Sequence, residues 1–197
     1  ETRTARLEAA HAARRRTEVL RRRGMIAGAV LIAVALLALV AANRASEREE
    51  EDRLAQLVTA GDCTLDSKTD GGSEHVPSPS FDLNPPAGGD HTPQAASEGV
   101  YEVGSVPPDG PLVHALEHGF IVLWYRAGAD QADVDALEAI YEDHSNAVLV
   151  APRQDLPTPI AATSWHKRLL CPSVDDQALR EFVKGYQDKG PEKGFIT

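Results

Sequence analysis

The sequence predicts an α+β protein, in which a small sheet with helices mainly on one face follows a Pro/Gly-rich wrapping loop and a single transmembrane helix. Three observations predict it. Residues 24–42 form an apolar run without a charged residue. A segment dense in Gly, Pro, Ser and Asp extends from Thr64 to Gly110. Beyond it, short apolar runs alternate with stretches of helical periodicity, which is the pattern of a compact domain built on one sheet.

The apolar run at 24–42 is long enough to cross a bilayer, because a helix of this length extends about 28 Å. Residues 1–23 carry eight arginines against three glutamates, whereas the chain from Asn43 onward has a net charge of −15. Positive charge before a span marks its cytoplasmic end. We therefore expect a cytoplasmic basic helix at 1–23, then a single-pass transmembrane helix in the cell membrane. A cleaved signal peptide is the alternative, since Ala41-Ala42-Asn43 is compatible with a small-residue cleavage site.

Residues 43–62 are charged and place Leu54, Leu57 and Val58 at helical spacing, which predicts a helical stalk beyond the membrane.

The charge pattern also limits which partners are expected. The basic segment at 1–23 suits anionic lipid headgroups and is too short to predict nucleic-acid binding. The chain has no phosphate-cradling glycine loop and no dinucleotide motif, so we expect no nucleotide. The expected partners are the membrane and a membrane protein complex.

Residues 63–197 are expected to form the extracytoplasmic α+β domain, and this part contains the only two cysteines, Cys63 and Cys171. Two cysteines in an oxidising compartment usually pair, which predicts a structural disulfide. A thiol pair that binds copper or performs redox chemistry is the alternative. Such pairs usually have close spacing, as in C-x-x-C, and these two cysteines lie far apart in the chain.

The first part of this domain is the wrapping loop, within 64–110. It contains two histidines, each followed closely by a proline, in His75-Val76-Pro77 and His91-Thr92-Pro93. Prolines restrict the unfolded loop and so lower the entropy that it loses when it packs. We therefore expect the loop to pack on the domain, with a flexible spacer as the alternative. Gly99–Val103 is expected to form a short strand before the turn at 107–110.

The other elements follow from apolar patterning. Phe120–Tyr125 and Ala147–Ala151 are short apolar runs that predict buried strands. A further strand is expected from Ile160 to Trp165, running on to Cys171. Residues 130–144 and 175–185 each place apolar side chains on one face of a helix, which predicts two amphipathic helices that cover the sheet.

A seven-residue segment, VHALEHG, carries the strongest chemical signal. If it is helical, His114 and His118 lie one turn apart on the same face, and Glu117 borders that face. A histidine pair at this spacing can share one metal ion. His91 and His75 are further candidate ligands. Glu117 is either a ligand or a carboxylate that orients an imidazole.

The choice of metal can be narrowed by elimination. Imidazole suits copper, zinc, nickel and iron. The only methionine is Met25, inside the predicted span, which argues against a methionine-rich Cu(I) site. Copper has the highest affinity for such ligands in the Irving–Williams order, so a copper ion is favoured and zinc is the alternative.

Three functions are compatible with these residues. The favoured one is metal binding without catalysis, for delivery to, or support of, a membrane complex such as a respiratory complex. The second is a structural or accessory subunit that binds no metal. The third is a zinc-dependent hydrolase, because His114, Glu117 and His118 match the H-x-x-E-H signature of two zinc ligands and a general base. That motif expects a longer helix, whereas Gly119 and a strand follow here, so we predict no catalytic residue.

Several short motifs in this chain combine histidine, proline, glycine and aromatic residues. In chain order they are His75-Val76-Pro77, Pro85-Pro86-Ala87-Gly88-Gly89-Asp90-His91-Thr92-Pro93, Gly99-Val100-Tyr101 and Val113-His114-Ala115-Leu116-Glu117-His118-Gly119, with Tyr125 and Trp165 downstream. Together they resemble the bacterial domain-of-unknown-function family three-one-zero-five, over a region from Cys63 to Phe182. The resemblance implies an N-terminal anchor or export signal followed by one small outer domain. It implies no established activity.

Overall fold

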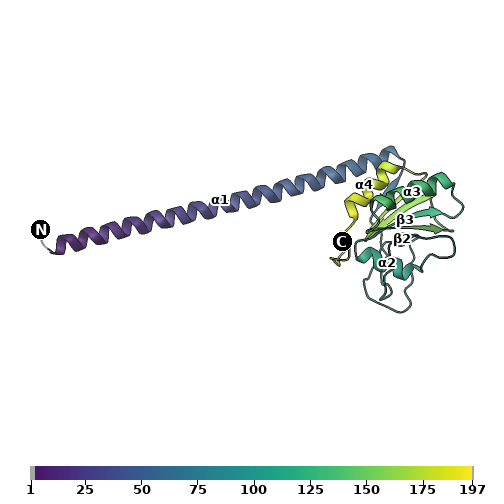
Figure 1. Cartoon of the computed structure of the whole chain (residues 1–197), viewed down its shortest axis with the longest axis horizontal. Coiled ribbons are helices and arrows are strands. Elements are labelled where there is room, and N and C mark those ends of the chain that lie inside the picture. The colour runs from purple at the N-terminus through teal and green to yellow at the C-terminus, as the bar shows by residue number, and fades with distance from the viewer. Residues whose placement is uncertain (1–2, 197) are drawn as a thin grey trace. The chain divides into compact units, whose positions relative to one another are not determined.

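The computed structural model describes residues 3–196, which fall into two compact units, one up to Glu49 and one from Glu50 onward. Helix α1 (Arg3–Ala60) is a single uninterrupted helix (Figure 1). Its part from Arg21 to Ala60 contains a stretch long and apolar enough to cross a membrane, and none of that stretch is buried within the protein. An apolar helix of this kind near the N-terminus is either a membrane anchor or a signal sequence.

The globular unit, from Glu50 onward, is built on a six-stranded mixed sheet with the strand order β1-β6-β5-β3-β4-β2. Strand β4 pairs in parallel with β3 and β2, whereas the pairs β3–β5, β5–β6 and β6–β1 are antiparallel. The strands are β1 (Thr64–Asp66), β2 (Gly99–Val100), β3 (Ile121–Arg126), β4 (Val148–Arg153), β5 (Ile160–Ser164) and β6 (Lys167–Cys171). The helices that follow α1 are α2 (Asp109–Glu117), α3 (Gln131–Asp143) and α4 (Asp176–Tyr186). The predicted α+β class is confirmed.

Helices cover both faces of the sheet, but most of them lie on one. Alternate side chains of β3 point to opposite faces, so Leu123 and Trp124 enter different cores. Leu123 packs with α3, α4 and the last turns of α1, from which Leu54 and Val58 are buried. Trp124 packs with α2, and its indole N–H donates to the Thr163 hydroxyl at 2.9 Å. Figure 1 accordingly shows α3 and α4 on one side of β3 and α2 on the other.

Three segments of the sheet differ from the prediction. Thr64–Asp66, expected within the wrapping loop, forms the edge strand β1 because it pairs with β6 from late in the chain. The strand expected over 99–103 is shorter, Gly99–Val100, and pairs with β4. The run expected over 160–171 is a hairpin of β5 and β6, whose turn holds His166 at a φ of 60°. Pairing between distant residues decides β1 and β2, and local periodicity carries little of that information.

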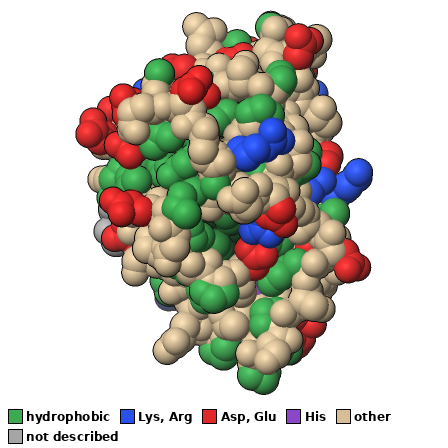
Figure 2. Space-filling view, turned by 90° about the vertical axis from the view of Figure 1, so that its right-hand side faces the viewer, with side chains coloured by type: hydrophobic (Ala, Val, Ile, Leu, Met, Phe, Trp, Pro, Cys, Tyr) green, Lys and Arg blue, Asp and Glu red, His purple; other side chains and the backbone are tan. Residues whose placement is uncertain are grey.

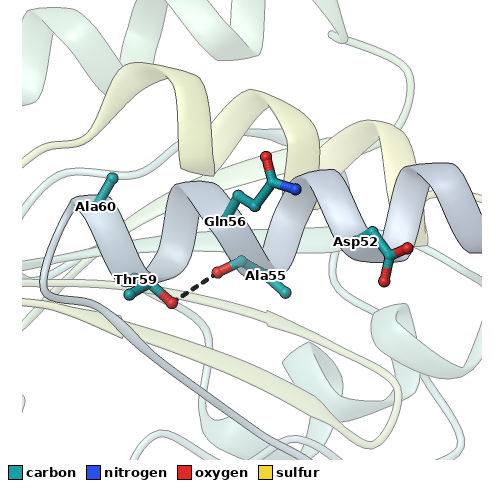
Figure 3. A pocket seen from close by; sticks show the side chains of 5 residues that line it. All are labelled: Asp52, Ala55, Gln56, Thr59 and Ala60. Atoms are coloured by element: carbon teal, nitrogen blue, oxygen red, sulfur yellow. Dashed lines mark hydrogen bonds between the residues drawn. The ribbon is translucent and has the colours of Figure 1, made fainter.

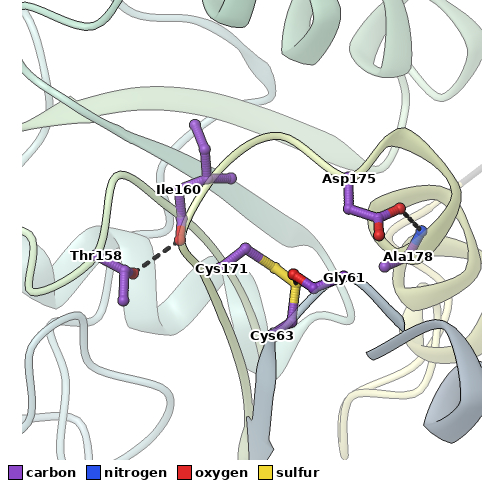
Figure 4. Close-up of a disulfide and its surroundings, with 7 residues drawn as sticks. All are labelled: Gly61, Cys63, Thr158, Ile160, Cys171, Asp175 and Ala178. Carbon is purple, nitrogen blue, oxygen red and sulfur yellow. Dashed lines mark hydrogen bonds between the residues drawn. A yellow bond between two sulfur atoms is a disulfide. The ribbon is translucent and has the colours of Figure 1, made fainter. Parts of the chain in front are cut away.

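A disulfide joins Cys63, just before β1, to Cys171, the last residue of β6 (Figure 4). The predicted pairing is therefore confirmed. The bridge ties the beginning of the wrapping loop to the sheet, and Figure 4 also shows Asp175 next to Ala178, whose backbone N–H it caps at the start of α4. Because disulfides persist in oxidising compartments, the bridge and the apolar helix together indicate a membrane or extracytoplasmic location.

Arg168 holds the wrapping loop, here residues 67–98, against the sheet. Its guanidinium donates two hydrogen bonds to Asp66, at 3.0 and 2.8 Å, across the β6–β1 pair. Another of its N–H groups donates to the carbonyls of Asn84 and Pro85, at 3.4 and 3.5 Å. The hydrogen bonds from Arg168 hold the pKa of Asp66 below its usual range, so this partly buried pair is charged at neutral pH. The loop is thereby fixed on the side of the sheet that α2 covers.

Candidate metal centre

Two segments bring the candidate ligands together. Helix α2 supplies His114 and Glu117, both of which are buried. The wrapping loop supplies His75 and His91, which lie side by side because a short parallel bridge joins them. In this bridge the Val76 N–H donates to the His91 carbonyl at 2.7 Å, and the His91 N–H donates to the Glu74 carbonyl at 3.0 Å. The loop therefore doubles back on itself to place both of its histidines over α2.

His91 is fully buried, and its ring is held by a hydrogen bond on each side. Its Nδ1 lies 2.9 Å from the carbonyl oxygen of Gly89. A carbonyl can only accept, so Nδ1 carries a proton and donates it. The other nitrogen, Nε2, lies 2.9 Å from Oε2 of Glu117. With a proton on Nδ1, Nε2 faces the carboxylate at a distance where the two atoms can share a second proton.

His114 is held in the same way. Its Nδ1 lies 2.6 Å from the carbonyl oxygen of Thr92, to which it donates. Its Nε2 lies 3.0 Å from Nε2 of His118. Histidines that bind metals usually donate the second ring N–H to a carbonyl or carboxylate, which fixes the tautomer and the ring orientation. Both buried histidines of the centre, His91 and His114, have this outer hydrogen bond.

His75 is the exposed member of the cluster. Its side chain is 43% exposed, and its Nε2 lies 3.5 Å from Oε2 of Glu117. Its ring stacks on that of His114, with centroids 4.7 Å apart, and meets the ring of His91 edge-on at 4.8 Å. We call His75, His91, His114 and Glu117 the inner group.

The inner group has the size of a metal site. Its four candidate ligand atoms all lie within 4.8 Å of one another. Ligand atoms around a tetrahedral zinc, with bonds of about 2.0–2.1 Å, stand roughly 3.3 Å apart. Small side-chain movements would therefore close the group on an ion. The group could hold a metal ion, and its geometry does not identify which one.

The contact between His91 and Glu117 requires a proton or a cation. Without a proton, Nε2 of His91 presents a lone pair, and Oε2 of Glu117 presents another 2.9 Å away. Lone pairs at this distance repel each other unless a positive centre lies between them. Glu117 is buried, so water screens the repulsion poorly. A proton supplies this charge at the hydrogen-bond distance observed, and a metal ion bound by both groups would take its place.

His118 belongs to a second cluster. Its Nε2 lies 3.1 Å from Oε2 of Glu192, in addition to its contact with His114. We call His114, His118 and Glu192 the outer group, whose candidate ligand atoms also lie within 4.8 Å of one another. Burial lowers the pKa of His118 below its usual range, and the neighbouring His114 lowers it further. The charged form of the His118 ring is therefore disfavoured, and a metal ion would take the place of the proton on Nε2.

The C-terminal segment places Glu192 by packing on the end of α2. A Cβ on Gly190 would lie 2.1 Å from the carbonyl oxygen of Glu117, so only glycine fits this approach. Gly119 has a φ of 90°, and a Cβ there would lie 2.8 Å from the backbone of Asp188. The N–H groups of Asp188 and Glu192 donate to the carbonyls of Gly119 and Glu117, at 2.9 and 3.2 Å. Glu192 was not predicted from the sequence because no motif surrounds it, and Gly119 was the only local signal of this contact.

The structure brings all five predicted metal-site residues to one place, but divides them between two groups. The rings of His114 and His118 lie next to each other, as their spacing predicts, in an edge-to-face arrangement with centroids 4.5 Å apart. Helix α2 ends at Glu117, however, and His118 is its C-cap. The carboxylate of Glu117 contacts His91 and His75. This short helix and the direction of Glu117 differ from the context that H-x-x-E-H hydrolases require.

Two other views of the described surface show no comparable set of ligands. Figure 3 shows a hollow along α1 in which Thr59 donates to the Ala55 carbonyl at 2.9 Å. The hollow is lined by Asp52, Ala55, Gln56, Thr59 and Ala60. One carboxylate without a histidine does not make a metal site. On the face drawn in Figure 2, acidic side chains are scattered among apolar ones, and hardly any histidine is visible.

Comparison with known proteins gives one match. A family model described as "Protein of unknown function (DUF3105)" matches residues 75–196. The matched region begins at His75 and includes every residue of the inner and outer groups. No curated protein and no solved structure matches the chain.

Proposed function

The chain belongs to the DUF3105 family, whose description assigns no activity, and we propose a function from the site itself: the domain binds one metal ion, copper in preference to zinc, through the inner group. One observation carries the proposal. Two buried imidazoles, His91 and His114, each donate Nδ1–H to a backbone carbonyl. Their Nε2 atoms face other candidate ligands, Glu117 for His91 and His118 for His114. This is how proteins prepare histidines for metal binding.

The donor set of the inner group supports copper or zinc. Three imidazole nitrogens and one carboxylate oxygen are intermediate ligands, which suit Cu(II) and Zn(II) better than Mg²⁺ or Ca²⁺. Copper has the higher affinity for such a set in the Irving–Williams order. The only methionine, Met25, lies in the apolar stretch of α1, so the globular unit offers no thioether that would favour Cu(I).

The proposed role is delivery of the metal to a membrane complex, or support of that complex, on the outer side of the membrane. In this proposal residues 1–23 are a cytoplasmic helix, 24–42 cross the membrane once, 43–62 form a stalk, and 63–197 are the outer domain. The basic charge before the apolar stretch supports this orientation. The disulfide supports an oxidising location for the domain.

The same proposal assigns no catalytic residue. A hydrolase of the H-x-x-E-H type needs its glutamate free to activate a water molecule beside the metal. The Oε2 atom of Glu117 instead lies 2.9 Å from Nε2 of His91 and 3.5 Å from Nε2 of His75, which supports a role as a ligand of the inner group. The two functions therefore predict different effects of the same substitution, Glu117→Gln.

Glu117→Gln is expected to weaken metal binding about 10- to 100-fold, because it removes the negative charge of the inner group and a candidate ligand. The measurement is a titration of the full chain in detergent with Cu(II) and with Zn(II), each in competition with a chelator of known affinity. Glu142→Gln, at an exposed position on α3, is the matched control. Unchanged affinity together with loss of peptide hydrolysis would identify a hydrolase instead. No saturable binding of either metal to the wild type would overturn the proposal.

A further inference from the structure

His114 is common to the inner and outer groups, and it can serve only one of them at a time. Its Nδ1 is occupied by the hydrogen bond to Thr92. Only Nε2 remains, and an imidazole nitrogen has a single lone pair for one metal ion. The inner and outer groups cannot therefore both hold an ion through His114. An ion that leaves one group for the other can keep its bond to this nitrogen.

The outer group is open to solvent through Glu192. The Glu192 side chain is 45% exposed, and that of His118 is 12% exposed. His91 and Glu117, on the other side of His114, are buried. Exposure thus falls from Glu192 through His118 and His114 to His91. A hydrated ion would meet the Glu192 carboxylate first and would lose its water as it moved inward.

Neighbouring groups hold the His118 ring and the backbone of Glu192 in place. The His118 ring stacks on Phe195, with centroids 3.5 Å apart and planes 2° from parallel. Gly190 packs against the carbonyl oxygen of Glu117, and the backbone N–H of Glu192 donates to the same carbonyl. The backbone of the C-terminal segment is therefore held against the end of α2, and the Glu192 carboxylate reaches Nε2 of His118 from it.

We propose that the outer group is a second metal site, which captures copper or zinc ions and passes them to the inner group. During the transfer the ion keeps its bond to Nε2 of His114 and exchanges its other ligands. The inference rests on the proposed function of the inner group. No electron is transferred, because the ion exchanges His118 and Glu192 for His91, His75 and Glu117. The competing route is direct entry past His75, whose side chain is 43% exposed.

The test measures metal uptake by the full chain in detergent, with Zn(II) and Cu(II) supplied from a chromophoric chelator in a stopped-flow instrument. Glu192→Gln is expected to slow metal uptake roughly 10-fold, which is the lower end of the effect of removing a partner from a metal site. The equilibrium affinity of the chain, which the inner group sets, is expected to change less than about threefold. Glu142→Gln is the matched control and is expected to take up metal at the wild-type rate.

A second variant isolates the outer group. His91→Ala combined with Glu117→Gln disables the inner group, and circular dichroism checks that the domain is folded. This double variant is expected to retain weak binding, which the addition of Glu192→Gln lowers by a further factor of about 10. If the wild type binds metal but Glu192→Gln changes neither the uptake rate nor this weak binding, the outer group is not a site, and ions enter past His75. If the wild type binds no metal, the proposed function fails as well.

Discussion

Replacing His114 with alanine is expected to lower the affinity of the full chain for copper and zinc by more than about 100-fold. This loss is larger than the one caused by removing a residue that only orients a ligand. The reason is that His114 belongs to both the inner and the outer group, while its Nδ1 is used by the Thr92 carbonyl. No other residue of the site belongs to both groups. The measurement is equilibrium competition with a chelator of known affinity, on wild type and variant in the same detergent.

His144→Ala provides the matched control for this substitution. His144 follows α3 and belongs to neither group of candidate ligands. The control is therefore expected to bind metal with wild-type affinity. Circular dichroism spectra of both variants check that the domain is folded. Wild-type affinity in a folded His114→Ala protein would contradict the assignment of both groups.

Removal of the disulfide has the second large expected effect, on stability. Cys63→Ser combined with Cys171→Ser opens a loop whose ends are 108 positions apart. In the chain-entropy account, a bridge closing about 100 residues contributes roughly 4.7 kcal/mol by restricting the unfolded chain. We therefore expect the free energy of unfolding to fall by about 3–5 kcal/mol. Urea unfolding of the oxidised wild type and the double variant, followed by circular dichroism, measures the difference.

The reduced wild type serves as the control for the two serine substitutions, because it loses the bridge without a change of sequence. It is expected to unfold at the same urea concentration as the double variant. A loss below about 1 kcal/mol in both proteins would contradict a structural role for the bridge.

Local patterns in the sequence were sufficient to predict the α+β class and most elements. The apolar run of β3 and the amphipathic helices α3 and α4 have strong periodicity, and each forms where it was expected. The short strands β1 and β2 depend on partners far away in the chain, β6 and β4. Such pairing leaves little local trace, and for this reason β1 was predicted as loop and β2 as a longer strand.

The candidate site was predictable to the extent that its residues occur in recognisable motifs. The spacing of His114 and His118 predicted neighbouring side chains on one face of a helix, and the prolines near His75 and His91 predicted a loop that packs. The division of the ligands into two groups was not predictable. It depends on the bridge between His75 and His91 and on the docking of the segment that carries Glu192, which are contacts between distant residues.

The most direct test of the central claim is the metal content of the purified full chain, measured by elemental analysis after loading with copper or zinc and removal of unbound ions. The wild type is compared with His91→Ala combined with Glu117→Gln, a variant that retains the outer group. The account predicts about one tightly held ion per wild-type chain and its loss from the variant. A wild-type chain that retains neither copper nor zinc would contradict it, and the buried histidines would then be structural.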